Sequence, residues 1–137
     1  MRLMIAALCA YAVMAAGAAF LFAIVLAEPF APLVALFRPA VEQQQTAVWA
    51  YVAQFLRTFA FVGIIVLLRG RGRLPVATGA VYGLLAGLFI GTFHIANTAS
   101  LPLPFETGAA WVVFDTTLLV LGGVVFALAY RPLKAVL

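Results

Sequence analysis

Two charged side chains and the chain's single histidine lie inside apolar stretches of the sequence. Arg57 is embedded in AQFLRTFAF, Asp115 in VVFDTTLL and His94 in FIGTFHIAN. A guanidinium and a carboxylate can form an ion pair, and an imidazole coupled to a carboxylate can exchange a proton near neutral pH. These residue types therefore have the chemistry of a proton site, or of a site for an anion or a small polar solute, provided that the fold brings them together.

The composition places these residues in a membrane. The chain has 137 residues, of which 67% are hydrophobic and 9% charged, and its mean hydropathy is +1.21. Soluble proteins average about 45–50% apolar and about 25% charged residues. We therefore expect an all-α integral membrane protein that contacts the lipid bilayer.

The charge balance and the residue counts exclude several other classes. The net charge is +4, but most of the basic residues flank apolar segments, which argues against a nucleic-acid partner. One cysteine, Cys9, and one histidine cannot build a closed zinc site or ligate a haem from both sides. We expect no metal and no cofactor.

Four apolar segments are long enough to cross a hydrocarbon core about 30 Å thick. They cover roughly residues 3–27, 46–68, 75–97 and 108–130, and they predict a single transmembrane domain, a compact bundle of four helices. The first segment is longer than the apolar region of a signal peptide, so we expect it to be retained as a span. The outer loop 28–45 is expected to lie along the membrane interface or to re-enter the membrane briefly.

The basic residues predict the orientation of the bundle. An alternating path places six of them on one side: Arg2, Arg69, Arg71, Arg73, Arg131 and Lys134. Only Arg38 is then expected outside. The excess of Lys and Arg marks the cytoplasmic side, so both termini are predicted to be cytoplasmic, in the plasma (inner) membrane of a prokaryote.

The third span carries a glycine at every fourth position, which puts all of these glycines on one helix face. In lipid, such a face allows another helix to approach closely. The first span is a plausible partner because it has alanines at the same spacing, and the fourth span contributes Gly122 and Gly123. The neighbour can be in the same chain or in a second copy, and the residues concerned are Gly79, Gly83, Gly87 and Gly91, with Ala15, Ala19 and Ala23.

The depths of the charged residues favour an ion pair. At 1.5 Å per residue, Arg57 lies about 16 Å and Asp115 about 10 Å from the outer ends of their spans. Charges inside the membrane normally face the protein interior and find a partner. We predict an Arg57–Asp115 pair, joined by Gln54, by His94 at the end of the glycine face, and by Asn97 in one polar pocket of the outer half.

Plainer interpretations of the same residues remain open. The ion pair can be a structural clip between two helices, and His94 an interfacial hydrogen-bonding group. Trp49 and Trp111 near the outer ends are typical of the aromatic belt at a membrane interface.

Two functional classes follow from these features. The first is a non-catalytic membrane protein that acts mainly through helix packing, as an accessory subunit of a membrane complex or a self-assembling bundle. The alternative is a small oligomeric transporter or channel that uses the polar site formed by Arg57, Asp115 and His94. No enzyme is expected, because motifs such as HExxH, GxSxG and CxxC are absent.

Overall fold

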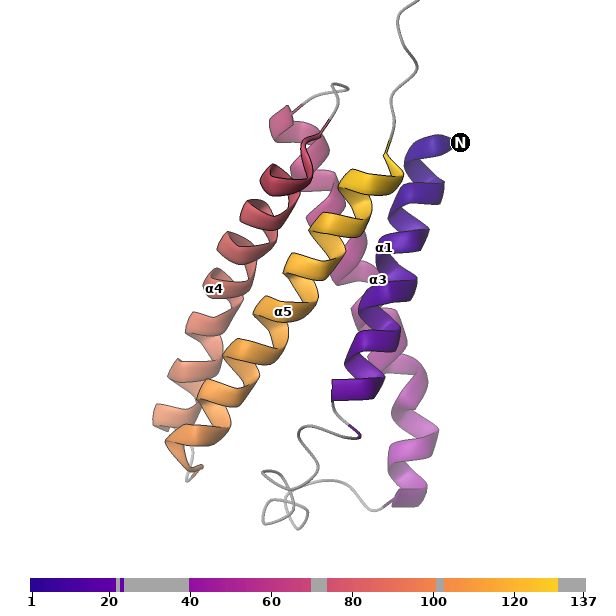
Figure 1. The fold of residues 1–137 in the computed structure, drawn as a ribbon. Helices are drawn as coiled ribbons and strands as arrows, with labels where there is room; N and C mark the ends of the chain where they lie inside the picture. Colours follow the sequence, from indigo (N-terminus) through magenta and orange to yellow (C-terminus); the bar gives the residue numbers. More distant parts are fainter. Residues whose placement is uncertain (22, 24–39, 70–73, 101–102, 131–137) are drawn as a thin grey trace, which may run out of the picture.

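Four long helices make up the part of the chain that the computed structural model describes, residues 1–21, 23, 40–69, 74–100 and 103–130. They run alternately up and down, so that the start of the first helix and the end of the last lie at the same end of the molecule (Figure 1). Each is long and apolar enough to cross a membrane. The helices are α1 (Arg2–Phe20), α3 (Ala40–Arg69), α4 (Val76–Ser100) and α5 (Phe105–Ala129). They confirm the expected all-helical architecture with four candidate spans.

The helix bounds differ from the sequence expectation at several ends. The second helix begins at Ala40, so the last six residues of the predicted outer loop are helical, and the candidate span within this helix is Val48–Arg69. Glu42 lies in the first turn, where an acid interacts favourably with the helix dipole, and no Gly or Pro interrupts residues 40–45. The last helix begins directly after Pro104. Residues 22 and 24–27 of the predicted first span, and loop residues 28–39, lie outside the described residues.

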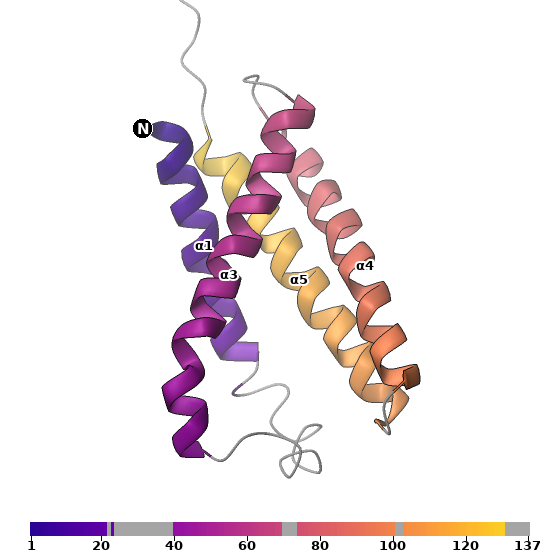
Figure 2. The same cartoon turned by 180° about the vertical axis from the view of Figure 1, so that it is seen from behind.

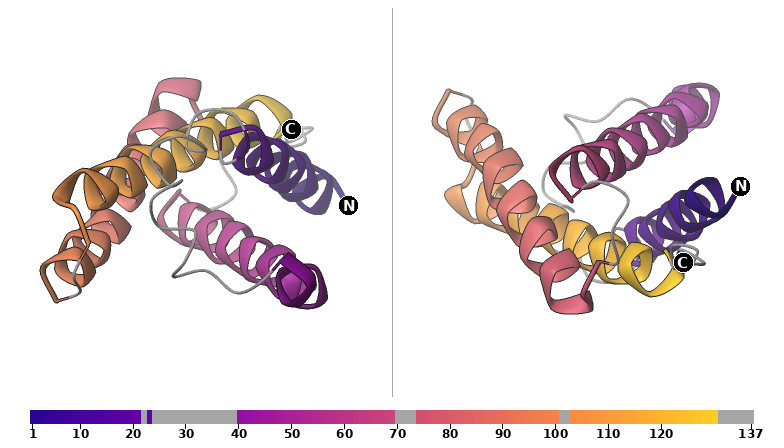
Figure 3. Two further views of the ribbon diagram at one scale, coloured as in Figure 1. Left: turned by 90° about the horizontal axis from the view of Figure 1, so that it is seen from below. Right: turned by 90° about the horizontal axis from the view of Figure 1, so that it is seen from above.

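The helices pack against one another to unequal extents. α4 and α5 lie side by side along most of their lengths, and α1 packs against α5 and α3 (Figures 1 and 3). α3 crosses the α4/α5 pair at an angle, which Figure 2 shows from the side of α3, and it touches those two helices only sparsely. The shared core lies where α1, α3 and α5 meet, and its largest fully buried side chains are Phe126, Met14, Ile65, Leu118, Leu119 and Thr58. α3 is therefore the helix least firmly attached to the rest.

The glycine face of α4 packs against α5. A side chain on Gly83 would clash with the backbone carbonyl of Leu119, and one on Gly79 would clash with the carbonyl of Gly123. Gly123 in turn lies against the backbone of Gly79, so two glycines meet and the helices approach more closely than a glycine and an alanine would allow. All of the predicted glycines, Gly79, Gly83, Gly87 and Gly91, are buried.

Of the two spans with small residues that could meet this glycine face, the first span does not, because α5, which carries Gly122 and Gly123, occupies the face. The alanines proposed as the partner stripe do not form the buried side of the first helix: Ala15 is half-buried, and Ala19 and Ala23 are exposed. α1 instead buries Ala6, Ala7, Ala10 and Met14.

Candidate functional site

Asp115 lies at the centre of a polar cluster inside the bundle. Its carboxylate Oδ1 accepts a hydrogen bond from Nη1 of Arg57, and Oδ2 lies 2.7 Å from Nε2 of His94. Asp115 comes from α5, Arg57 from α3 and His94 from α4, so one carboxylate links three helices. The residue is 4% exposed. The predicted Arg57–Asp115 ion pair is confirmed, and His94 is its neighbour.

Gln54 supports Arg57 from the same helix. Its side-chain Oε1 accepts a hydrogen bond from Nη2 of Arg57, three residues further along α3. This spacing places the two side chains on one helix face. We call Asp115, Arg57, His94 and Gln54 together the Asp115 cluster.

Thr58 fixes α3 against α1 beside the cluster. Its hydroxyl donates to the backbone carbonyl of Gln54 at 2.8 Å and lies 3.6 Å from Sδ of Met14 in α1. Thr58 is fully buried and was not among the residues predicted to form the site. Its position directly after Arg57 was the available signal, since a threonine in a membrane helix commonly bonds a carbonyl one turn back.

Trp111 covers the imidazole of His94. The two rings are stacked, with centroids 5.7 Å apart and planes 21° from parallel. Trp111 precedes Asp115 by one helical turn, so both residues project from the same face of α5. Trp111 thus contacts the cluster in addition to its expected place near the membrane interface, whereas Trp49 is 68% exposed.

Asn97 does not join the cluster. It is exposed, whereas Thr98 beside it is buried and donates to the carbonyls of Ile95 and His94. Three residues beyond His94, Asn97 lies roughly 60° further round the helix, away from the face that the glycines define. Four of the five residues that were predicted to share one polar pocket therefore contact one another in the Asp115 cluster.

Some buried polar atoms in the Asp115 cluster and next to it in the chain have no hydrogen-bond partner. Buried atoms without a hydrogen bond include Nε2 of Gln54 and Nε of Arg57 on α3, and Oγ1 of Thr116 on α5. An unpaired buried donor is costly unless water or another acceptor reaches it. The α3 side of the cluster is therefore suited to an additional hydrogen-bond acceptor. Within the described residues, no group of three or more His, Cys, Asp and Glu side chains is arranged to hold a metal ion.

The charges of the cluster balance when the imidazole is neutral. Arg57 supplies one positive charge and Asp115 one negative charge, and a proton on His94 changes the sum from zero to +1. The side chains of Arg57 and His94 are 24% and 27% exposed, whereas that of Asp115 is 6% exposed. Only the two basic partners therefore have access to the surroundings.

Comparisons with protein-family models, with curated proteins and with solved structures find no match to this chain. The class of protein therefore follows from the fold alone. Four apolar helices define a small multi-pass membrane protein that contacts the lipid bilayer.

Proposed function

We propose that this membrane protein is a small proton-linked transporter and that the Asp115 cluster is its proton-binding site. The observation that carries the proposal is the sharing of one buried carboxylate between Arg57 and His94. Ionisable residues inside a membrane are costly, and they commonly mark ion pathways or proton relays.

The three side chains have complementary roles in this proposal. Arg57 supplies a permanent positive charge beside the carboxylate of Asp115, and His94 is proposed as the group that takes up and releases the proton, since histidine is the common proton shuttle of proteins. The indole of Trp111 stacks on the imidazole and holds the orientation of the ring beside Asp115. Within the described residues, no other charged side chain forms an ion pair with Arg57, Asp115 or His94.

Protonation of His94 would loosen the contact between α3 and the α4/α5 pair. An imidazolium on Oδ2 would share the single negative charge of Asp115 with Arg57 on Oδ1 and repel the guanidinium, and α3 has few other contacts with those two helices. A freed Arg57, with Gln54 beside it, presents donors to a small solute that carries hydrogen-bond acceptors. Four helices rarely enclose a pathway alone, so the proposal includes an assembly of at least two copies.

Proton movement in reconstituted vesicles tests this function. Wild-type protein should dissipate a pH gradient, read from a trapped pH-sensitive dye, at least about tenfold faster than empty vesicles, which corresponds to a barrier to proton movement lower by about 1.4 kcal/mol. Asp115→Asn and His94→Gln should abolish the flux. Thr92→Val is the matched control, because Thr92 is exposed on the same helix and bonds only the carbonyl of Phe89.

Two outcomes would contradict the proposal. The first is an absence of flux over a range of pH and solutes, and the second is an equal flux in wild type, Asp115→Asn and His94→Gln. In either case the Asp115 cluster would be a structural clip that fastens α3.

A second candidate is an accessory subunit or a self-assembling bundle that acts through helix packing. It is favoured by the apolar side chains that each of the four described helices leaves exposed, which can face lipid or another membrane helix. Purification from the native membrane distinguishes the two candidates. A stoichiometric companion protein favours the subunit, whereas a symmetric assembly of this chain alone favours the transporter.

The proposed location is the plasma membrane of a prokaryote with both termini in the cytoplasm. It is supported by six basic residues on one side of the predicted path and one on the other. We propose no catalytic role, because the sequence carries no HExxH, GxSxG or CxxC motif.

A further inference from the structure

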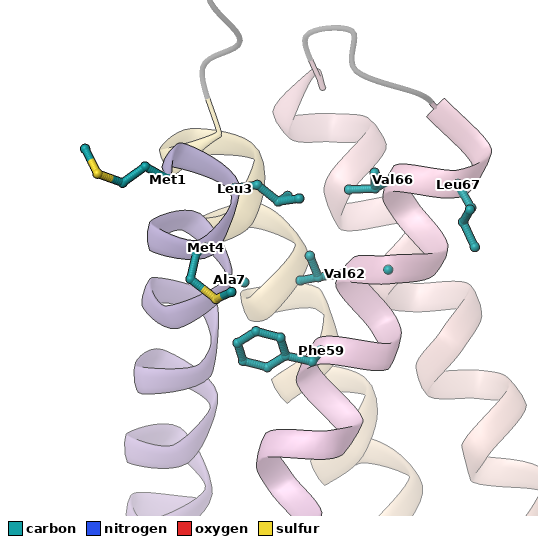
Figure 4. Close-up of a pocket in the computed structure, with 9 residues that line it drawn as sticks. Met1, Leu3, Met4, Ala7, Phe59, Val62, Val66 and Leu67 are labelled. Carbon is teal, nitrogen blue, oxygen red and sulfur yellow. The ribbon is translucent and has the colours of Figure 1, made fainter.

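An apolar groove lies between α1 and α3 at the end of the molecule where α1 begins. Its volume is about 500 Å³, within the range of about 300–1,000 Å³ that small-molecule pockets typically have. Figure 4 shows Met4 and Ala7 of α1 on one side, with Phe59, Val62 and Val66 of α3 on the other. Every residue that lines the groove is apolar or a glycine.

The groove exists because α1 and α3 diverge from a tight contact toward the end of the molecule where α1 begins. Tyr11 of α1 meets Phe55 of α3 edge to face, with ring centroids 5.6 Å apart. Phe59 stacks on Phe55 at 4.2 Å and closes the deep end of the groove. Between this point and the helix end, Gly63 contributes no side chain, and a Cβ placed on it would meet nothing within 4 Å.

The length of the groove matches one leaflet of a bilayer. Phe59 and Arg69 are ten residues apart on α3, which corresponds to about 15 Å along the helix. The hydrocarbon core is about 30 Å thick, so a leaflet contributes about half of that. An acyl chain that enters from the end near Arg69 would reach Phe59 at about the depth of the bilayer centre.

Two arginines stand at the open end of the groove. Arg2 directly precedes Leu3 on α1, and Arg69 lies two residues beyond Leu67 on α3, where both leucines belong to the lining. Both arginines are exposed. Arg69 donates a single hydrogen bond to Thr78 at 3.2 Å, and a guanidinium has further N–H groups to offer. An apolar groove one leaflet deep thus has cationic donors at the level of the lipid headgroups.

We infer that this groove binds one anionic phospholipid, with an acyl chain between α1 and α3 and the headgroup phosphate at Arg2 and Arg69. Basic pockets between membrane helices on the cytoplasmic side recognise anionic headgroups, and the positions of Lys and Arg in the sequence predict that this end is cytoplasmic. The inference does not depend on the proton-transport proposal, since none of the cluster residues lines the groove.

Native mass spectrometry of the delipidated full-length protein tests the inference. The probes are dioleoyl phosphatidylglycerol and dioleoyl phosphatidylcholine, which differ only in their headgroups. Wild type should retain one phosphatidylglycerol per chain with a roughly tenfold to thirtyfold preference over phosphatidylcholine. Arg2→Gln combined with Arg69→Gln should reduce this preference to less than about threefold, because the two substitutions remove the guanidinium charges that would attract the anionic headgroup.

A second variant tests the acyl chain separately. Gly63→Leu fills the groove and should lower the retention of both lipids at least about fivefold, as expected for lost apolar contact. Val81→Leu is the matched control, since it adds bulk to an exposed position of α4 outside the groove. Circular dichroism shows whether each variant keeps its helices.

Equal retention of the two lipids by wild type would overturn the inference. So would retention in Gly63→Leu that equals retention in Val81→Leu. A third contrary result is a change from dimer to monomer in Gly63→Leu, which would make the groove an interface between copies of the chain. If Gly63→Leu fails to fold, the arginine variant alone decides.

Discussion

At the scale of single residues, Asp115 has two partners of different chemistry on its two oxygens. Arg57 is a permanent cation, whereas His94 is a cation only after it takes up a proton. Removal of the carboxylate therefore leaves a charged guanidinium without its anion in an apolar environment. Removal of the guanidinium leaves an acid that His94 can still partner.

Asp115→Asn should accordingly be more destabilising than Arg57→Gln. We expect the first to lower the free energy of unfolding by about 3 kcal/mol, because breaking a buried pair strands a charge. The double variant Arg57→Gln with Asp115→Asn should lose only about 1 kcal/mol, since two amides can replace the pair without any charge. Unfolding in mixed micelles, followed by circular dichroism, measures these values. Strictly additive effects of the two substitutions would show that the side chains do not interact.

At the scale of helices, α4 and α5 form the firmest unit because their backbones touch through glycine. Gly79 and Gly123 lie on each other, and Gly83 lies on the carbonyl of Leu119. This contact fixes the register between the helices that carry His94 and Asp115. The 2.7 Å distance between Nε2 of His94 and Oδ2 of Asp115 therefore depends on glycines one to four turns away.

Gly83→Ala should separate these two helices. The added methyl group would collide with backbone atoms of Leu119 and Val120, which cannot rotate away, and overpacking of this kind costs about 1–3 kcal/mol. Gly63→Ala is the matched control in α3, since the added atom meets nothing within 4 Å. It should be neutral or stabilising by up to about 1 kcal/mol, because alanine is the better helix former. Thermal unfolding in detergent measures both, and equal effects would contradict the close α4–α5 contact.

The sequence predicts the elements of this fold better than their pairing. The four spans follow from the length and hydropathy of each segment, and the Arg57–Asp115 pair follows from the need of a buried charge for a partner. The neighbour of the glycine face stayed open between the first and fourth spans, because small residues recur in three of the four spans and spacing alone does not select among them. Asn97 was misplaced for a related reason: the side of α4 that faces α5 is set by packing between the helices.

At the scale of the whole molecule, the alternating path places like ends together. The start of α1 and the end of α5 lie at one end, which is also where α3 ends and α4 begins (Figure 1). The lipid groove lies at this end and the Asp115 cluster lies deeper. A fixed orientation therefore decides from which side of the membrane a proton and a lipid would each reach the protein.

Labelling of single cysteines tests that orientation. In a Cys9→Ala background, Ser100→Cys at the exposed end of α4 should react with a membrane-impermeant maleimide in intact cells. Arg71→Cys, in the basic segment between the second and third spans, should react only after the cells are lysed. The reason is the bias of Arg and Lys toward the cytoplasmic side. Reaction of Arg71→Cys alone in intact cells would place both termini outside, and reaction of both variants would mean that the chain inserts in two orientations. Either result would also move the arginines of the lipid groove away from the anionic cytoplasmic leaflet that favours their proposed ligand.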